Sequence, residues 1–454
     1  MTQKILLYGI NFAPELTGIG KYTGEMAAWL AARGHQVRVV TAPPYYPAWK
    51  VGDGFRNGWT TEVMDCRGAG APRNDDEPDP SLRAKRGNPG CLVVYRCPLW
   101  VPRQPGGLKR LLHLASFALS SLPVMLRQIV WRPDVVWVVE PALFCAPAAV
   151  VVARLSGARA WLHVQDFEVD AAFDLGLLRG KLLRGLVTGA ERWLMRRFDV
   201  VSTISQRMHQ RLLAKGVAPA KARMAVNWVD LAAFGVEGDG LPRCARNDSQ
   251  PRHREAEGRG DLGCSGYRVQ LGIAPDAVVA LYSGNMGGKQ GLEVLADVAR
   301  LCPEVVFVFC GNGAGRADLV ARCQGLANVL LMELQPVERL PDLLAMADIH
   351  LLPQRADAAD LVMPSKLTGM LASARPVVAT AKPGTELANV VQACGLVVPP
   401  EDALAFADAL KSLAADPELR ERLGGAGFLY AQAHLDKEAV LAKFEADLLG
   451  LVLG

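Results

Sequence analysis

The stretch AVVALYSGNMGGKQGLEVLADVA, residues 277–299, decides the fold. Its β-branched run from Val278 to Leu281 predicts a buried strand, and the apolar spacing after Lys289 predicts a helix that begins at that lysine. The connecting loop contains three glycines, Gly284, Gly287 and Gly288. A glycine loop that leads into a helix directs backbone N–H groups at an anion, and a lysine there adds a full positive charge. The stretch therefore predicts a phosphate or pyrophosphate site, although an ordinary strand-to-helix turn with a surface lysine has the same pattern.

Length and composition limit the class of protein. A chain of 454 residues is too long for one ordinary core and predicts two or three domains. A net charge of only +4 with 21% charged residues is typical of a globular enzyme, and no nucleic-acid partner is expected. The ten cysteines include no CxxC pair, which favours a reducing compartment, and the start MTQKILLYGI resembles a strand rather than a secretion signal.

The first 41 residues predict a complete βαβ unit. Its parts are a strand at 4–8, a helix at 22–32 and a strand at 36–41. The connecting loop after the first strand is long and closes with Gly18 and Gly20. A dinucleotide site needs its glycines directly after the first strand and an acid after the second, so binding of NAD or FAD is not expected.

The same pattern predicts an α/β protein with two doubly wound, Rossmann-like domains facing each other across a cleft. Further strands are expected at 134–139, 158–164 and 199–202, and a second series at 278–282, 305–310, 329–332, 349–352, 376–380 and 396–398. We expect an N-terminal domain over 1–230 and a C-terminal domain over 267–435. A linker at 231–266 separates them, and a last helix at 436–454 returns to the first domain. Two polar stretches, 65–91 and 238–265, interrupt the pattern as insertions.

Polar side chains follow the predicted strand at 158–164. His163 lies near the carboxyl end of this strand and Asp166 in the loop beyond it, where open α/β sheets place their ligands. A lone histidine in a strand is more often a core residue, but the neighbouring acids Glu168 and Asp170 favour a site. His163 and Asp166 are therefore candidate catalytic residues.

Two segments with apolar faces and cationic residues suggest contact with a membrane surface. They are 108–131 and 179–198, and no acidic residue occurs between 81 and 133. Such segments can lie in the plane of an anionic membrane, although two crossover helices packed on a sheet would read alike. The longest apolar run, 111–126, is too short to span a bilayer, so no transmembrane helix is expected.

Seven ordered motifs carry a resemblance to a known family. The chain resembles the retaining glycosyltransferases of family 4, which have the two-domain GT-B fold, and within them the colanic acid type of bacterial exopolysaccharide enzyme. The motifs are GINFAPELTGIGKY at 9–22, NWVD at 227–230, YSGNMGGKQG at 282–291, FCGNGAGRADL at 309–319, LLAMADIHLLP at 343–353, MPSKLTGMLASARPVVAT at 363–380 and CGLVVPPED at 394–402.

The resemblance implies a reaction and its partners. A sugar would pass, with retention, from a nucleotide diphosphate sugar to a lipid-linked oligosaccharide at the anionic inner face of the membrane. Colanic acid relatives are associated with GDP-fucose, which is the expected donor. No metal or other cofactor is expected, because no DxD-like pair of carboxylates is evident and cationic side chains would replace Mg²⁺. The protein would be cytoplasmic and peripheral at the membrane.

The resemblance also assigns the N-terminal domain to the acceptor, the C-terminal domain to the nucleotide sugar, and individual residues to the site. Lys289 corresponds to the family's pyrophosphate lysine, in a catalytic and donor-binding role, and Asn285 stands where the family often has arginine. The remaining donor-binding candidates are Gly18, Gly20, Gly284, Pro364, Ser365, Lys366 and Leu367.

One departure from the family leaves alternatives open. Many members have two glutamates eight residues apart, and this chain has Leu361 and Gly369 at those positions. Asp357 and Asp360 lie near the first position, and Glu386 is a candidate replacement in donor binding. A nucleotide-sugar 2-epimerase of the same fold and a catalytically inactive scaffold remain as alternatives.

Overall fold

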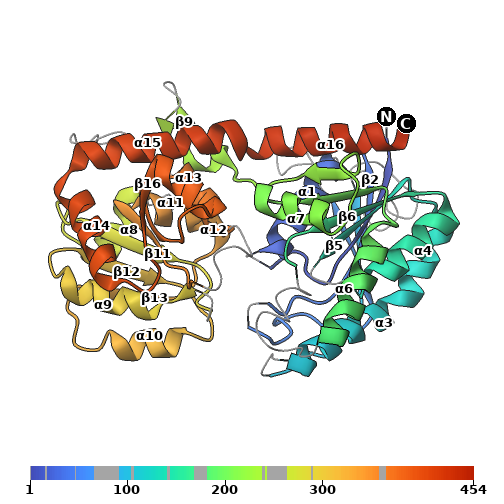
Figure 1. The fold of residues 1–454 in the computed structure, drawn as a ribbon, viewed down its shortest axis with the longest axis horizontal. Coiled ribbons are helices and arrows are strands. Elements are labelled where there is room, and N and C mark those ends of the chain that lie inside the picture. The colour runs from blue at the N-terminus through green and yellow to red at the C-terminus, as the bar shows by residue number, and fades with distance from the viewer. Residues whose placement is uncertain are drawn as a thin grey trace, which may run out of the picture. The chain divides into compact units, whose positions relative to one another are not determined.

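The computed structural model divides the chain into two compact units (Figure 1). The N-terminal unit comprises Met1–Val226 with Leu441–Gly454, and the C-terminal unit comprises Asn227–Val440. The structure describes residues 2–15, 18–46, 48–65, 91–103, 107–140, 144–167, 181–237, 241–242, 263–287, 290–356 and 364–453.

The described part of the N-terminal unit contains an eight-stranded sheet. Its strands lie in the order β3-β4-β2-β1-β5-β6-β7-β8, and all neighbours are parallel except β3 and β4. The bounds are β1 Lys4–Tyr8, β2 Gln36–Thr41, β3 Thr60–Asp65, β4 Cys91–Arg96, β5 Val135–Glu140, β6 Arg159–Val164, β7 Val200–Thr203 and β8 Ala222–Met224. Because parallel strands share a direction, their carboxyl ends form one edge, where the connecting loops gather.

Helices cover both faces of this sheet (Figure 1). On one face, residues such as Phe117, Val152 and Met195 pack with Tyr8 and Leu162 of the strands. They belong to α3 (Gly107–Trp131), α4 (Ala146–Ser156) and α6 (Lys181–Met195), and α7 (Gln206–Ala214) lies on the same face. On the other face lie α1 (Ile19–Ala32) and the end of α16 (Lys437–Leu453), whose Phe444 contacts the rings of Trp137 and Trp161. Burial on both faces explains the nearly continuous apolar strands.

The described part of the C-terminal unit contains a six-stranded sheet in the order β13-β12-β11-β14-β15-β16, with all neighbours parallel. The bounds are β11 Val279–Ser283, β12 Val306–Cys310, β13 Val329–Met332, β14 Ile349–Leu352, β15 Val377–Thr380 and β16 Gly395–Val398. Counted along the chain from β11, this is the 3-2-1-4-5-6 order of a nucleotide-binding Rossmann fold.

The helices of the C-terminal unit form two cores, one on each face of the sheet. They are α8 (Gly263–Gln270), α9 (Glu293–Leu301), α10 (Arg316–Arg322), α11 (Leu340–Ala345), α12 (Lys366–Ala372), α13 (Glu386–Cys394), α14 (Ala403–Ala415) and α15 (Pro417–His434). Shorter elements are the 3₁₀ helices η1 (Leu231–Phe234) and η4 (Val337–Arg339) and an antiparallel pair, β9 (Val236–Glu237) with β10 (Leu241–Pro242).

The two Rossmann-like domains expected from the sequence are present, with one difference in their bounds. Val229, predicted in the N-terminal domain, and Leu231 and Phe234, predicted in the linker, all pack in the C-terminal core. The Val229 backbone is hydrogen-bonded to Leu435 and Lys437. The chain is therefore divided at 226/227 and not at 230. The polar insertion at 65–91 falls between the antiparallel strands β3 and β4, and its interior, like that of 238–265, lies largely outside the described residues.

Candidate functional site

The C-terminal sheet has one position at which the direction of its chain connections reverses. Strand β11 lies between β12 and β14, so the connection after β11 leads to one side and the strands from β14 onward continue on the other. In open α/β sheets, ligands bind outside the carboxyl ends of the strands at this switch point. The loops there begin at Gly284, after β11, and at Pro353, after β14.

The glycine loop after β11 is fixed by a second glycine loop after β12. Gly284 donates its N–H to the Cys310 carbonyl, Met286 to the Asn312 carbonyl, and Gly315 back to the Met286 carbonyl. A Cβ at Gly313 would lie 2.6 Å from the Met286 carbonyl oxygen, and one at Gly311 would overlap the Gly284 carbonyl. The two backbones approach so closely that only glycine fits, which gives the loop a defined shape.

Lys366 lies against this loop. Its Nζ donates a hydrogen bond of 2.8 Å to the Tyr282 hydroxyl and lies 4.1 Å from the centre of the Tyr282 ring. A Cβ at Gly284 would be 3.7 Å from the same nitrogen. Burial lowers the pKa of Lys366 to about 7 from its usual value of 10.5. A lysine in these surroundings gains from a neighbouring anion, because the anion stabilises the charged form.

Tyr282 is a site residue that the sequence reasoning missed. It ends the apolar run of β11 and its side chain is fully buried, so by pattern it is only a core residue. Its hydroxyl donates to the Asn285 carbonyl over 2.6 Å while accepting from Lys366. The contact with Lys366 joins residues 84 positions apart. Local sequence carries no signal for such a contact.

The helix expected from Lys289 begins later. Helix α9 begins at Glu293, because Gly291 has a φ of +60°, which interrupts any helix between the loop and Leu292. Gly288 and Lys289 lie outside the described residues. The expectation that Lys289 opens the helix is wrong, and its role in binding pyrophosphate stays a prediction.

The loop before α12 contains the other donor-binding candidates, and the structure separates them. Pro364, Ser365 and Lys366 lie partly exposed at the start of this helix. Leu367 is different: its side chain is 2% exposed in the core and its N–H donates to the Pro364 carbonyl. Leu367 therefore offers no free group to a ligand. Gly369 replaces a family glutamate, and a Cβ there would lie 2.9 Å from Leu344 Cδ1.

Two further charged residues lie at this edge of the sheet. Arg355, three residues after β14, pairs with Glu293 over 2.9 Å and lies against Gly291. The sequence reasoning missed this arginine. Glu386 is the first residue of α13, after β15, and is partly buried. It therefore lies beyond the second strand from β11, on the same edge. Leu361, Asp357 and Asp360 lie outside the described residues.

In the N-terminal unit, the two glycines of the first loop have different roles. Gly18 caps α1 with a φ of +63°, and no atom lies within 4 Å of the position a Cβ would take. Gly20 is buried, and a Cβ there would lie 2.7 Å from the side chain of Glu15. Gly20 is thus required for packing, whereas Gly18 leaves room for a ligand at the start of the 14-residue helix α1, whose first turn contains no acid.

Glu15 connects two loops at the carboxyl edge of this sheet. Its side chain accepts hydrogen bonds from the Tyr45 and Tyr46 N–H groups, each at 3.1 Å, and from Asn11 Nδ2 at 2.9 Å. Burial raises the pKa of Glu15, and the hydrogen bonds oppose that effect. The loop containing Gly18 is therefore attached through Glu15 to the loop after β2.

His163 lies in a buried stack. Its ring is 5.2 Å from that of Trp137, and its Nδ1 is 2.9 Å from Ser202 Oγ, which also accepts from Trp161 Nε1. Burial lowers the pKa of His163 to about 3, so the ring is neutral at physiological pH and a weak base. These contacts favour the core role over the catalytic one.

Asp166 lies in the described start of the loop after β6 and is partly buried. The next residue, Phe167, is buried beneath the side chains of Lys215 and Arg211. The acids Glu168 and Asp170, which favoured a site here, are outside the described residues. The catalytic role of Asp166 stays a prediction.

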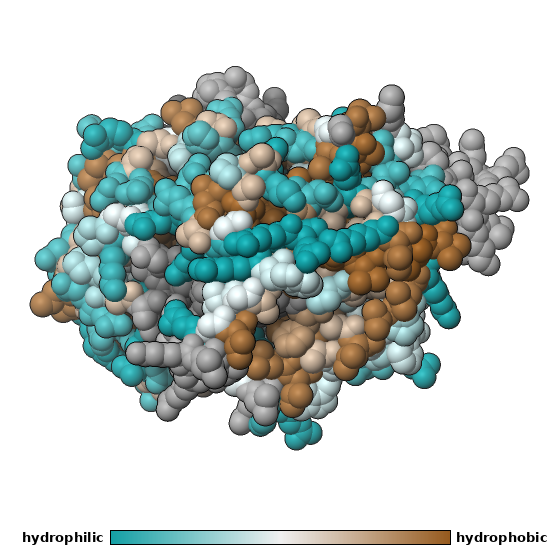
Figure 2. Space-filling model, turned by 45° about the vertical axis from the view of Figure 1, so that its right-hand side comes forward, coloured by the Kyte–Doolittle hydropathy of each residue, from teal (hydrophilic) through white to brown (hydrophobic). Residues whose placement is uncertain are grey.

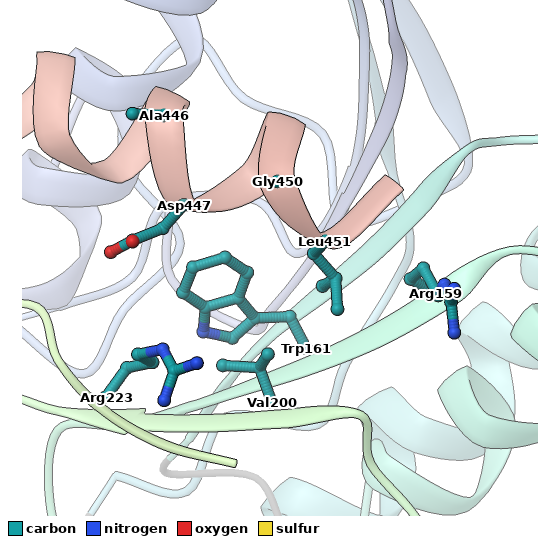
Figure 3. A pocket seen from close by; sticks show the side chains of 8 residues that line it. All are labelled: Arg159, Trp161, Val200, Arg223, Ala446, Asp447, Gly450 and Leu451. Atoms are coloured by element: carbon teal, nitrogen blue, oxygen red, sulfur yellow. The ribbon is translucent and has the colours of Figure 1, made fainter. Parts of the chain in front are cut away.

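A pocket of about 380 Å³ lies in the N-terminal unit, away from these loops (Figure 3). Trp161 lies at its centre, with Arg223 and Asp447 on one side and Leu451 on the other, and Arg159 begins strand β6. The pocket is therefore at the amino ends of the strands, the edge opposite to that of Gly18 and Asp166.

Two features of the described residues bear on metals and membranes. They contain no group of three or more His, Cys, Asp or Glu side chains that could hold a metal ion. One helix segment, Lys109–Trp131 of α3, is long and apolar enough to cross a membrane by length and composition. This segment is longer than the apolar run 111–126 on which the sequence prediction was based. Phe117 and Met125 of the segment pack in the core on one face of the sheet, as in a crossover helix.

Comparison with known proteins identifies the class. Residues 17–228 match the glycosyl transferase 4-like domain, and residues 277–416 match glycosyl transferases group 1. Among solved structures, sucrose-phosphate synthase from Thermosynechococcus elongatus superposes with a TM-score of 0.68 at 17% identity, covering 99% of both chains. HepE of Anabaena gives 0.63 at 15% identity, covering 98% of this chain and 100% of that one. The fold is the GT-B fold of glycosyltransferases.

A curated relative extends over the whole chain. WcaI of Escherichia coli (strain K12), a glycosyl transferase that its name assigns to colanic acid biosynthesis, is 41% identical over 461 aligned positions, which cover 98% of this chain and 100% of the relative. The alpha-D-kanosaminyltransferase of Streptomyces kanamyceticus is 26% identical over 241 positions, covering 52% of this chain and 56% of the relative. The chain belongs to the family 4 glycosyltransferases, and it is a transferase of the GT-B type.

Proposed function

We propose that this glycosyltransferase binds the diphosphate of a nucleotide sugar at the switch point of its C-terminal sheet and transfers the sugar in bacterial exopolysaccharide assembly of the colanic acid type. The observation that carries the proposal is the Lys366 ammonium held beside the Gly284 loop. The 41% identity to WcaI over the full chain supports the colanic acid role.

The reaction needs charge stabilisation, which these residues can supply. When the sugar leaves, negative charge grows on the diphosphate, and a fixed donor aimed at it is worth on the order of 3 kcal/mol where water is excluded. Lys366 would supply a full positive charge. The resemblance also assigns Gly18 to donor binding, and the first-turn N–H groups of α1 beside it form a candidate anion site within the N-terminal unit. Cations and amides would thus do the work of a metal ion.

The finer assignments follow from the resemblance to the colanic acid type. GDP-fucose is the proposed donor, a lipid-linked oligosaccharide the proposed acceptor, and retention of the anomeric configuration the proposed outcome. Pro364 and Ser365 would line the donor next to Lys366, and Glu386 would replace a missing family glutamate.

A screen of nucleotide sugars by thermal shift tests the donor. A true donor stabilises the folded protein by mass action, by about 2.7 kcal/mol at a hundredfold excess over Kd. We expect GDP-fucose to raise the melting temperature of the wild type but not of Lys366→Ala. Lys411→Ala, an exposed lysine on α14, is the matched control and should respond like the wild type. An equal response of Lys366→Ala would remove Lys366 from the site, and a response to UDP-sugars alone would replace the donor.

We also propose that the face formed by α3, α4 and α6 contacts an anionic membrane at the cytoplasmic side. Several apolar side chains are exposed there, among them Leu119 at 72%, Val130 at 87%, Leu155 at 65%, Leu186 at 66% and Trp193 at 58%. Figure 2 shows apolar surface on the side of the N-terminal unit that carries these helices.

The charges on these helices favour anionic lipid. Neither α3 nor α4 contains an acidic residue. The acid of α6, Glu191, is buried and paired with Lys215 over 2.5 Å. Cations that remain at the surface can approach lipid phosphates while the apolar side chains enter the acyl boundary.

Flotation with vesicles tests this surface. We expect binding to phosphatidylcholine vesicles that contain phosphatidylglycerol and little binding to phosphatidylcholine alone. Leu119→Glu with Val130→Glu should abolish it. Leu404→Glu with Leu429→Glu replaces leucines that are 67% and 61% exposed in the C-terminal unit and should leave binding intact. Equal loss in both double variants would contradict a specific face.

A further inference from the structure

Tyr282 and Lys366 form a hydrogen-bonded pair, and the proposed function assigns a role only to the lysine. The tyrosine side chain has no exposed surface, yet its hydroxyl makes two hydrogen bonds at the edge of the sheet. It accepts from Lys366 Nζ at 2.8 Å and donates to the Asn285 carbonyl at 2.6 Å. One hydroxyl therefore joins the lysine of α12 to the backbone of the glycine loop.

We propose that Tyr282 is a positioning residue for donor binding: its hydroxyl and ring hold the Lys366 ammonium against the Gly284 loop, where the diphosphate binds. This inference rests on the proposed function, because it assumes that Lys366 meets the diphosphate. The ring fixes one side of the ammonium, 4.1 Å from the ring centre, and the hydroxyl fixes one of its N–H groups. The other two N–H groups remain for phosphate oxygens, since an ammonium has three donors.

The surroundings of Lys366 contain no compensating charge in the described part of the chain. Helix α12 has no other titratable residue, and the Gly284 loop contributes Asn285, which does not titrate. From β11 the facing group is Tyr282, whose pKa burial raises, so it stays protonated. Burial alone lowers the pKa of Lys366, with no contribution from a neighbouring charge among those residues.

A proton consequently accompanies the diphosphate. Above pH 7 the free protein holds Lys366 largely as the neutral amine, and a bound diphosphate favours the ammonium. Binding therefore takes up a proton from the buffer at Nζ. Tyr282 reduces the amount of proton uptake that binding needs, because its oxygen accepts from the Lys366 ammonium and so favours the charged form. Without the Tyr282 hydroxyl, the affinity for the diphosphate should begin to fall at a lower pH, as the pH is raised, than it does in the wild type.

Calorimetric titration of GDP and UDP into the full-length protein tests the inference, at pH 6 and pH 8 and in two buffers with different ionisation enthalpies. For the wild type we expect proton uptake at pH 8 that largely disappears at pH 6. Tyr282→Phe keeps the ring and removes the hydroxyl, and at pH 8 we expect about tenfold weaker binding, as for a lost hydrogen bond to a charged group. Lys366→Arg keeps a charge at every pH and should bind without proton uptake.

The matched control is Tyr267→Phe, which removes another buried tyrosine hydroxyl of the same unit. That hydroxyl is bonded to Gln335 over 3.1 Å, away from Lys366. If Tyr282→Phe binds GDP and UDP as Tyr267→Phe does, with the same uptake of protons, Tyr282 does not position the lysine. If Lys366→Met binds both nucleotides as the wild type does, the proposed function fails instead, and the two failures are distinct. If Tyr282→Phe does not fold, Lys366→Arg tests the inference by itself. Proton uptake in Lys366→Arg equal to that of the wild type would overturn the inference.

Discussion

Replacing Lys366 by methionine should stabilise the protein and weaken donor binding at the same time. The substitution keeps the length of the side chain and removes the charge. In the folded protein that charge is buried against Tyr282, and burial lowers the pKa of Lys366 from 10.5 to about 7. A lowered pKa in a base means that folding disfavours the charged form, which the unfolded chain accepts freely.

The size and sign of the effect follow from the same shift. At about 1.4 kcal/mol per pH unit, the shift sets an upper limit of about 5 kcal/mol. The residue is partly exposed, so we expect about 2 kcal/mol. Between pH 7 and pH 10.5 the unfolded chain binds more protons than the folded one, so this cost declines as the pH rises through that window. Below pH 7 both states are protonated and the cost is fully present.

Differential scanning fluorimetry from pH 6 to pH 9.5 measures the outcome. At pH 6, Lys366→Met should melt about 4 to 8 °C above the wild type, from about 2 kcal/mol in a unit of this size. The gain should shrink towards pH 9.5, and a saturating nucleotide sugar should stabilise the wild type only. Lys411→Met replaces an exposed lysine of α14 and should melt like the wild type at every pH, with and without the nucleotide sugar. The reasoning is refuted if Lys366→Met melts with the wild type at pH 6, or if its gain is independent of pH.

Three further predictions concern packing, loops and metal. Gly424→Ala should lower the free energy of unfolding by about 2 kcal/mol or more, because its Cβ would overlap the Ala374 carbonyl. Gly425→Ala, on the same helix, places its Cβ where no atom lies within 4 Å and should raise the free energy of unfolding by about 0.5 kcal/mol. Urea titration of both variants measures the difference. Glu15→Ala removes the carboxylate that accepts from the Tyr45 and Tyr46 N–H groups and should cost about 2 to 4 kcal/mol by the same assay, with a smaller loss for Glu15→Gln, which keeps an accepting oxygen. EDTA should leave the rate of sugar transfer unchanged, because Lys366 and helix amides would supply the positive charge, and a loss that Mg²⁺ restores would contradict this.

The fold was predictable because its signal is periodic and local. Short apolar runs mark the strands, and the strands predicted at 4–8, 36–41, 329–332 and 349–352 have the same bounds in the structure. Strands β3, β4 and β8 were missed. β3 and β4 flank a long polar insertion, and β8 has only three residues, so none of them shows a clear run between turn signals.

The site was predictable only where a motif marks it. Gly284 and Lys366 were selected from their motifs, and the structure brings them together. Gly20 was expected to approach a ligand, but its missing Cβ makes room for Glu15, a requirement set by tertiary packing. The start of α9 depends on the backbone conformation of Gly291, which composition alone does not reveal.

The cations near the C-terminal sheet differ in their partners, and the difference supports a ligand beside Lys366. At the amino edge, Arg268 pairs with Asp348 over 2.7 Å, and Asp348 also accepts the Val279 N–H over 2.8 Å. A cation near this sheet can therefore be matched to an acid within the fold. At the carboxyl edge, Arg355 is likewise paired with Glu293, but Lys366 contacts a tyrosine and has no acid partner among the described residues, which costs stability. An external dianion would remove that cost, so an unmatched lysine beside two interlocked glycine loops is better explained by a bound diphosphate than by a requirement of folding.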